Sequence, residues 1–129
     1  MTIQYLKLEI FIPATHFRIL QKTLQSADAG HIGNYDSCLS YSPVMGTWRP
    51  LEGTTPYIGK ENEISEEEEY KVEVTIKKEN LEKTMTAVKE IHPYEEPVII
   101  CHSSLRRRDW SSLLINDTVQ TKIALSYKR

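Results

Sequence analysis

Several features that mark other classes of protein are scarce or missing in this sequence of 129 residues. Its two cysteines, Cys38 and Cys101, form no CxxC pair and no disulfide framework. No stretch approaches the ~20 apolar residues that a membrane span needs, and residues 1–13 lack the small-residue cleavage site of a signal peptide. We therefore expect a reduced, soluble protein of the cytoplasm that does not bind a membrane.

An excess of charge of one sign is also lacking. The 16 Lys and Arg residues nearly balance the 18 Asp and Glu residues, for a net charge of −2. A general nucleic-acid binder carries a basic surface, so nucleic acid is not an expected partner. The acidity is concentrated between positions 61 and 69, and we interpret the run 66–69 as a solvated entrance to a strand.

Alternating and helical patterns of apolar residues are present in the first half of the chain. Residues 3–12 alternate, which predicts a half-buried strand closed by Pro13. Thr15 is the expected N-cap of a helix whose apolar stripe includes Phe17, Leu20 and Leu24, and Gly30 is the expected glycine cap at its end. A second strand is predicted over residues 34–41.

Regular structure is not expected over residues 42–60, which hold several glycines and three prolines. A loop of this length in a small domain is usually functional or mobile. Further on, the patterns predict a strand over residues 70–76, a helix from about residue 80 that Pro93 ends, and a strand over residues 97–101. A weaker alternation over residues 119–127 suggests one more strand.

The order strand–helix–strand–strand–helix–strand predicts an α+β fold, the ferredoxin-like βαββαβ antiparallel sheet with two helices on one face. We expect one such domain over residues 1–104, and a strand-like extension over residues 105–129 that packs on the domain or on a neighbouring subunit. The strand directions bring the long loop and residues 92–97 to one end of the sheet, and residues 30–36 to the other. Tyr5, Phe11 and several other tyrosines are available to make the second face apolar, so we expect self-association through it.

Four segments resemble a known family. They are residues 30–38 (GHIGNYDSC), 46–53 (GTWRPLEG), 56–59 (PYIG) and 92–97 (HPYEEP). Together they are similar to the small PII/CutA-like domain of the Nif-three (NGG-interacting factor-like) family, and the last is also similar to the corresponding motif of CutA proteins. The likeness covers roughly residues 1–100.

The resemblance implies a PII/CutA-type fold that assembles as a homotrimer, with small molecules bound in clefts between subunits. In the family this domain is an insert in a larger dinuclear-metal protein, whereas here we expect it to stand alone. The family's histidine-rich metal-binding halves have no counterpart among the four histidines of this chain. Its hydrolase-like activity is therefore not carried over, and we expect a non-catalytic module, not an enzyme.

The candidate ligand-binding residues lie in the long loop and in the turn before the last strand of the domain. An arginine can hold a carboxylate or phosphate, and a tryptophan can stack on a ring. Alternatively, the same residues pin the loop to the body or to another subunit. The candidates are Thr47, Trp48, Arg49, Glu52, His92, Tyr94 and Glu95.

A divalent metal, copper or zinc, is the alternative ligand, since CutA proteins are associated with tolerance of divalent cations. The candidate metal ligands are His92, Glu95, Glu96, Cys101 and His102. In the competing interpretation, His92 and Pro93 end a helix and the carboxylates bond backbone or a neighbouring subunit. Adjacent Glu95 and Glu96 would point in opposite directions on an extended chain, which favours the structural interpretation. No cofactor is firmly expected.

Overall fold

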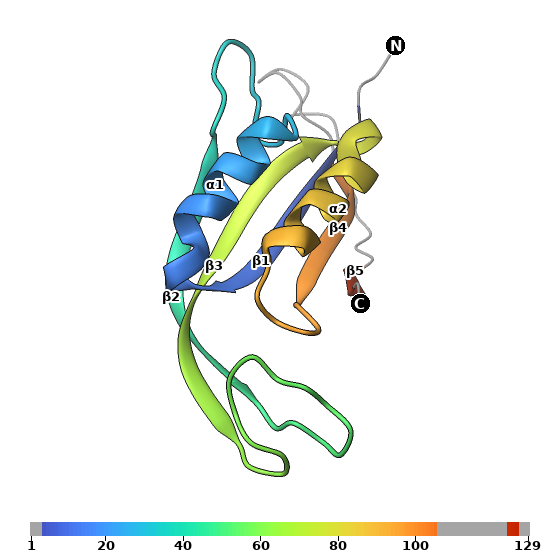
Figure 1. The fold of residues 1–129 in the computed structure, drawn as a ribbon. Helices are drawn as coiled ribbons and strands as arrows, with labels where there is room; N and C mark the ends of the chain where they lie inside the picture. Colours follow the sequence, from blue (N-terminus) through green and yellow to red (C-terminus); the bar gives the residue numbers. More distant parts are fainter. Residues whose placement is uncertain (1–3, 106–123, 127–129) are drawn as a thin grey trace.

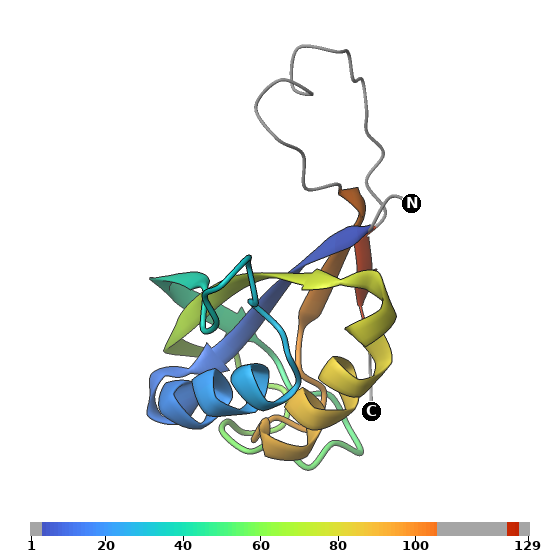
Figure 2. The ribbon, with the colours of Figure 1, turned by 90° about the horizontal axis from the view of Figure 1, so that it is seen from above.

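A computed structural model describes residues 4–105 and 124–126 of the chain. Its strands are β1 (Tyr5–Pro13), β2 (Leu39–Trp48), β3 (Ser65–Lys77), β4 (Ile99–Leu105) and β5 (Ala124–Ser126), and its helices are α1 (Phe17–Ser26) and α2 (Leu81–Ile91). The sheet order is β2-β3-β1-β4-β5, and every neighbouring pair is antiparallel. Both helices lie on one face of the sheet (Figures 1 and 2). The predicted ferredoxin-like α+β fold is therefore confirmed.

The core lies between the sheet and the two helices. In β1, the alternate residues Leu6, Leu8, Ile10 and Ile12 are buried on the helix side. Fully burying one such side chain stabilises the fold by about 1.5–3 kcal/mol. Leu20 and Leu24 of α1 and Val88 of α2 pack in the same cluster, as the helical spacing predicted.

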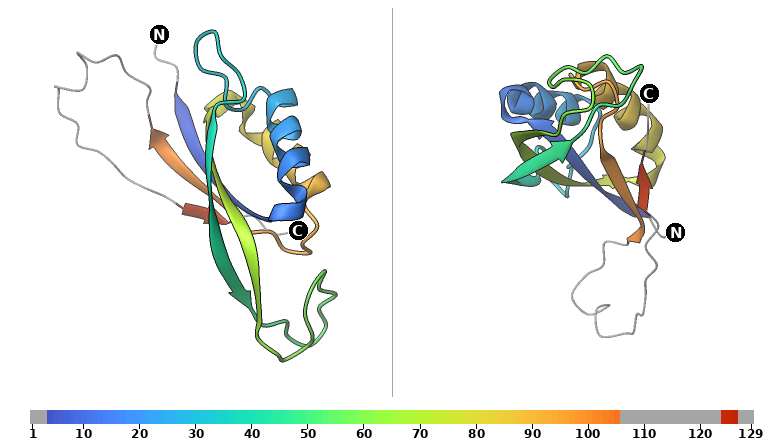
Figure 3. Two further views of the ribbon diagram at one scale, coloured as in Figure 1. Left: turned by 90° about the vertical axis from the view of Figure 1, so that its left-hand side faces the viewer. Right: turned by 90° about the horizontal axis from the view of Figure 1, so that it is seen from below.

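The hairpin of β2 and β3 is longer than predicted. The expected strand at 34–41 and loop at 42–60 are replaced by a strand that continues to Trp48, paired with β3 from Leu39↔Val74 to Trp48↔Ser65. Pro43 is tolerated because β2 is an edge strand, where a missing N–H does not interrupt a second ladder. Glu66–Glu69 lie within β3, and the hairpin extends beyond the helices (Figure 3).

The first helix begins differently from the prediction. A 3-10 turn (Ala14–His16) precedes α1, and no side chain caps either element. The hydroxyl of Thr15 lies 2.9 Å from Nδ1 of its neighbour His16, so it is used there and not as an N-cap. A second 3-10 turn (Lys78–Asn80) precedes α2, which ends at Ile91 because His92, before Pro93, is extended.

Gly30 does not cap α1, since that helix ends four residues earlier, at Ser26. Its φ of +80° and the carbonyl oxygen of Cys38, 2.6 Å from where a Cβ would lie, both require glycine. The loop that contains it leaves the sheet at the end opposite the hairpin loop, as the strand directions predicted (Figure 1).

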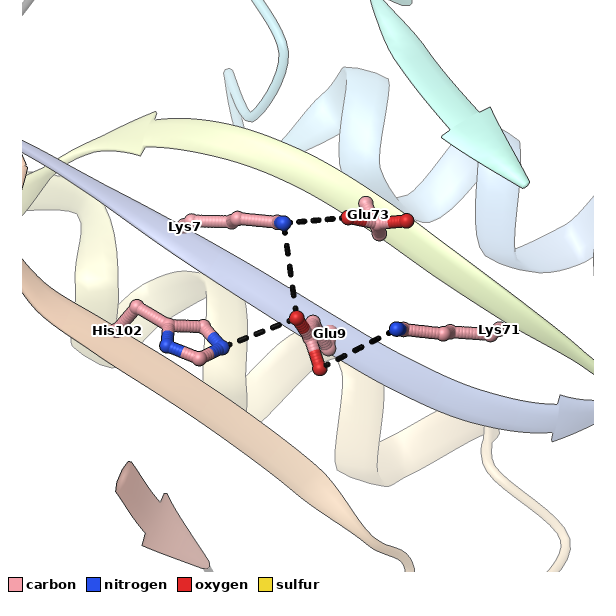
Figure 4. A network of polar contacts seen from close by, with 5 residues as sticks. All are labelled: Lys7, Glu9, Lys71, Glu73 and His102. Atoms are coloured by element: carbon pink, nitrogen blue, oxygen red, sulfur yellow. Dashed lines mark hydrogen bonds and ion pairs between the residues drawn. The ribbon is translucent and has the colours of Figure 1, made fainter. Parts of the chain in front are cut away.

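The face of the sheet away from the helices, called here the open face, is charged at its centre. The Glu9 carboxylate forms ion pairs with Lys7 Nζ at 3.6 Å and Lys71 Nζ at 3.8 Å, and lies 3.0 Å from His102 Nε2 (Figure 4). Lys7 also pairs with Glu73, and this hydrogen bond raises the pKa of Lys7 and lowers that of Glu73. The expectation of an apolar open face is therefore wrong at its centre.

The C-terminal part of the described chain adds an edge to the sheet. β5 (Ala124–Ser126) pairs with β4 through Ile100↔Ser126, Cys101↔Leu125 and His102↔Ala124. Residues 119–123 and 127 of the predicted last strand lie outside the described residues. Neither helix in the described ranges has the length and apolar character that a membrane crossing requires.

Candidate ligand-binding pocket

A pocket of about 440 Å³ lies where the β2–β3 hairpin loop meets the turn before β4. We call it the hairpin pocket. It is lined by Phe11, Gly46, Thr47, Trp48, Pro50, Thr54, Pro56, Tyr57, Ile58, Glu69, Tyr94, Glu95, Glu96, Val98 and Ile100. The sequence had predicted that these two segments meet at one end of the sheet.

Aromatic rings make up one wall of the hairpin pocket. The ring centroids of Trp48 and Tyr94 are 5.5 Å apart, and those of Tyr57 and Tyr94 are 6.2 Å apart. Such separations are typical of favourable aromatic pairs. Trp48 Nε1–H donates a hydrogen bond of 3.1 Å to the carbonyl oxygen of Ile58, so the loop itself holds the indole in place.

His92 anchors the turn before β4 to the sheet. Its Nε2 lies 2.7 Å from the carbonyl oxygen of Phe11, and its Nδ1 lies 3.2 Å from the amide nitrogen of Tyr94. A carbonyl only accepts and an amide N–H only donates, so His92 is neutral here with its proton on Nε2. The side chain is buried, and both ring nitrogens are occupied.

Buried Glu69 and half-buried Tyr94 form a hydrogen-bonded pair beside the aromatic wall. The Tyr94 hydroxyl donates a hydrogen bond of 2.8 Å to Glu69 Oε2, and Glu69 is only 6% exposed. Burial, followed by this hydrogen bond, raises the pKa of Tyr94. Gly46 gives the carboxylate room, because a Cβ at this position would lie 2.7 Å from Glu69 Cδ.

The hairpin loop is also tied directly to the turn. The backbone N–H of Thr55 donates a hydrogen bond of 3.0 Å to Glu95 Oε1. This contact spans 40 residues of sequence. It closes the loop over the hairpin pocket.

The structure gathers some of the expected ligand-binding residues and leaves others outside. Thr47, Trp48, Tyr94 and Glu95 line the hairpin pocket, and Glu96 joins them. His92 lies behind Tyr94, with the two ring centroids 5.1 Å apart. Arg49 and Glu52 are exposed and are not among the lining residues.

The five candidate metal ligands are not brought together. Cys101 pairs with Leu8 and is buried on the helix side, where burial raises the pKa of its thiol. Its neighbour His102 points to the open face and contacts Glu9. Within residues 4–105 and 124–126, no group of three or more His, Cys, Asp or Glu side chains could hold a metal ion.

Sequence reasoning missed Phe11, Tyr57 and Glu69 as parts of the pocket. The alternation of β3 could have placed Glu69 on the open face with Lys71 and Glu73. Its burial had no local signal, because it depends on Tyr94, 25 residues further along the chain.

Comparison with known proteins supports the fold and the resemblance. The family model for the CutA1 divalent ion tolerance protein matches residues 53–109. A Bacillus cereus protein related to NIF3 superimposes with a TM-score of 0.72 at 31% identity, over 82% of this chain and 27% of that one. The chain has a CutA-like fold and is similar in sequence to part of NIF3-related proteins. CutA from Archaeoglobus fulgidus has the same fold, with a TM-score of 0.60 at 18% identity, over 81% of this chain and 88% of that one.

Curated relatives of this CutA-like domain correct one expectation. A protein of Halalkalibacterium halodurans is 43% identical over 91 residues, and one of Bacillus subtilis is 33% identical over 90 residues. Both are named GTP cyclohydrolase 1 type 2 homolog, and in both cases the match covers 70% of this chain and 24% of the relative. The chain thus spans about a quarter of these relatives.

The expectation that the chain is not an enzyme is therefore wrong, because its relatives are named after an enzyme. Most of each relative lies outside the segment that matches these 129 residues.

Proposed function

We propose that this PII-like module binds a small organic molecule with a flat ring in the hairpin pocket. The observation that carries the proposal is the aromatic wall of Trp48, Tyr57 and Tyr94 around a pocket of about 440 Å³. Pockets of ~300–1,000 Å³ that combine apolar walls with a few polar groups are typical of small-molecule sites.

The contacts of the wall support binding of a flat ring. The Trp48 indole is held by its hydrogen bond to Ile58, so the ring needs little reordering when a ligand arrives. Phe11 of β1, Ile100 of β4 and Val98, which directly precedes β4, add an apolar floor. Ring stacking on such a wall contributes about 0.5–1.5 kcal/mol beyond area burial.

Guanosine is a suitable probe, because the curated relatives are named after a GTP-processing enzyme. Benzamide is the second probe, a neutral flat ring. We propose to follow the Trp48 indole N–H by nitrogen-15 NMR in the full chain carrying Trp110→Phe, which leaves Trp48 as the single tryptophan. A saturable shift with either probe is expected.

Two exposed tyrosines give matched variants. Tyr57 lines the pocket and is 53% exposed, whereas Tyr35, 75% exposed, lies in the loop at the opposite end of the sheet. Tyr57→Ala should weaken binding about 2–10-fold through lost ring contact, and Tyr35→Ala should leave it unchanged. If neither probe shifts the Trp48 signal, the proposal is wrong.

We also propose that the module self-associates through its open face, as a homotrimer. No element of the described chain covers this face, whereas the helices cover the other (Figure 3). At its centre Glu9, only 13% exposed at the side chain, is paired with cationic partners, and this pairing makes the network less costly to enclose than unpaired charges would be.

A further inference from the structure

The charged residues around the hairpin pocket all have the same sign. Glu69, Glu95 and Glu96 line it, and none of the lining residues is Lys, Arg or His. Arg49, which the sequence suggested as a partner for an anion, is not a lining residue. An anionic ligand would therefore meet carboxylates without a compensating cation from the wall.

Glu69 is the carboxylate placed to contact a ligand. Its side chain is buried, with 6% of the residue exposed, and it belongs to strand β3 at the end of the ladder with β1, not to a loop. Tyr94 occupies Oε2, whereas Oε1 lies against Gly46, and no donor in the described part of the chain bonds to it. Gly46 and Glu69 both line the pocket.

A carboxylate in this state gains from a further donor. Glu69 Oε1 is not one of the fully enclosed polar atoms without a partner in the described residues, so it is reachable from the pocket, where a ligand donor can supply its hydrogen bond. Hydrogen bonds from a cationic donor to a carboxylate are about twice as strong as neutral ones. The Thr55 N–H already occupies Glu95 Oε1, so Glu95 is partly satisfied within the chain.

We propose that Glu69 makes the hairpin pocket selective for flat rings that carry a cationic or N–H-donating nitrogen group, such as amidines and ring amines. The ring lies on the wall of Trp48, Tyr57 and Tyr94, and its nitrogen group donates to Glu69 Oε1. This inference rests on the proposed function, since it names the class of ligand for the same pocket.

Three probes share the same benzene ring but differ in charge, so they separate the effect of charge from that of shape. They are benzamidinium, neutral benzamide and benzoate. Titration of each into the full chain carrying Trp110→Phe, followed at the Trp48 indole N–H, measures the preference. We expect benzamidinium to bind at least ten times more tightly than benzoate, with benzamide between them.

Glu69→Gln tests the residue itself. The amide keeps an oxygen that accepts the Tyr94 hydroxyl but loses the charge, so benzamidinium should bind about as weakly as benzamide. Glu68→Gln is the matched control, because Glu68 is an exposed neighbour in the same strand whose side chain lies on the other face. This variant should keep the preference. A circular dichroism spectrum that matches that of the unmodified chain shows that Glu69→Gln is folded.

The outcomes distinguish this inference from the proposed function. Benzoate binding as tightly as benzamidinium, or a preference that survives Glu69→Gln, overturns the role of Glu69 while leaving the flat-ring pocket in place. Failure of all three probes overturns the pocket as a ligand site, and the inference with it.

Discussion

Tyr94 joins three parts of the molecule through one side chain. Its hydroxyl donates to Glu69 of β3, its ring packs against Trp48 of β2, and its backbone N–H donates to His92. A substitution at a residue with several such partners changes several contacts of the pocket at once. Two predictions follow from its contacts.

The first concerns alkaline pH. The pKa of Tyr94 is raised in the folded chain, so this hydroxyl keeps its proton where the unfolded chain, with an ordinary tyrosine pKa of about 10, releases it. The folded state then binds more protons, and the stability that Tyr94 contributes is complete below pH ~10 and is lost as the pH rises further.

Absorbance at 295 nm should show a tyrosine ionisation that appears only when the chain unfolds, and we assign it to Tyr94. Tyr94→Phe should remove that late step and flatten the loss of stability above pH ~10. Tyr35→Phe, at an exposed site, serves as the control and should leave both unchanged. A late step that persists in Tyr94→Phe would contradict the assignment.

The second prediction concerns His92. Removing its ring leaves the Phe11 carbonyl and the Tyr94 N–H without their partner. His92→Ala should therefore lower the free energy of unfolding by about 1–3 kcal/mol, measured by urea denaturation. His31→Ala, in the exposed loop at the other end, should cost no more than about 0.5 kcal/mol. Equal losses in the two variants would show that His92 does not anchor the turn.

At the scale of elements, the β2–β3 hairpin determines where the pocket lies. β2 is paired on one side only, so it can contain Pro43 and continue to Trp48 beyond the body of the domain. Gly46 lies in this extension, opposite Glu67 and against the side chain of Glu69. The hairpin thereby provides both the aromatic wall and the space for a buried carboxylate.

Gly46→Ala tests this close approach. In an ordinary strand the change would stabilise the fold by roughly 0.5–1 kcal/mol. Here the new Cβ would displace the Glu69 carboxylate and break the hydrogen bond from Tyr94, so we expect a net loss of about 1 kcal/mol. In a Glu69→Ala background the same change should become neutral or stabilising. A destabilisation of equal size in both backgrounds would mean that the contact with Glu69 is not its cause.

At the scale of the whole molecule, the two faces of the sheet differ in what covers them. Helices α1 and α2 cover one face, while the open face carries paired charges at its centre and Phe11, Val98 and Ile100 toward the hairpin pocket. An assembly that covers this face would also bring a neighbouring chain close to the pocket.

Sedimentation velocity of the full chain should show a trimer. Lys71→Glu places a third carboxylate beside Glu9 and Glu73 on the open face, and should shift the distribution toward monomer. Lys22→Glu makes the same change in charge at an exposed position of α1, and should leave the trimer intact. Circular dichroism checks that both variants are folded. A monomeric unmodified chain would contradict self-association.

The sequence alone determined the buried face of β1, the apolar stripes of both helices and the end of α2 shortly before Pro93, because each depends on neighbours a few residues apart. It also placed the hairpin loop and residues 92–97 at one end, since strand directions follow from the order of elements.

Tertiary structure decided the rest. The length of β2 depends on its partner β3, the burial of Glu69 depends on Tyr94 and Gly46, and the closure of the loop depends on the Thr55–Glu95 hydrogen bond. Each of these contacts joins residues distant in the chain. A local pattern carries no information about such contacts, so the chemical character of the pocket emerged only from the folded molecule.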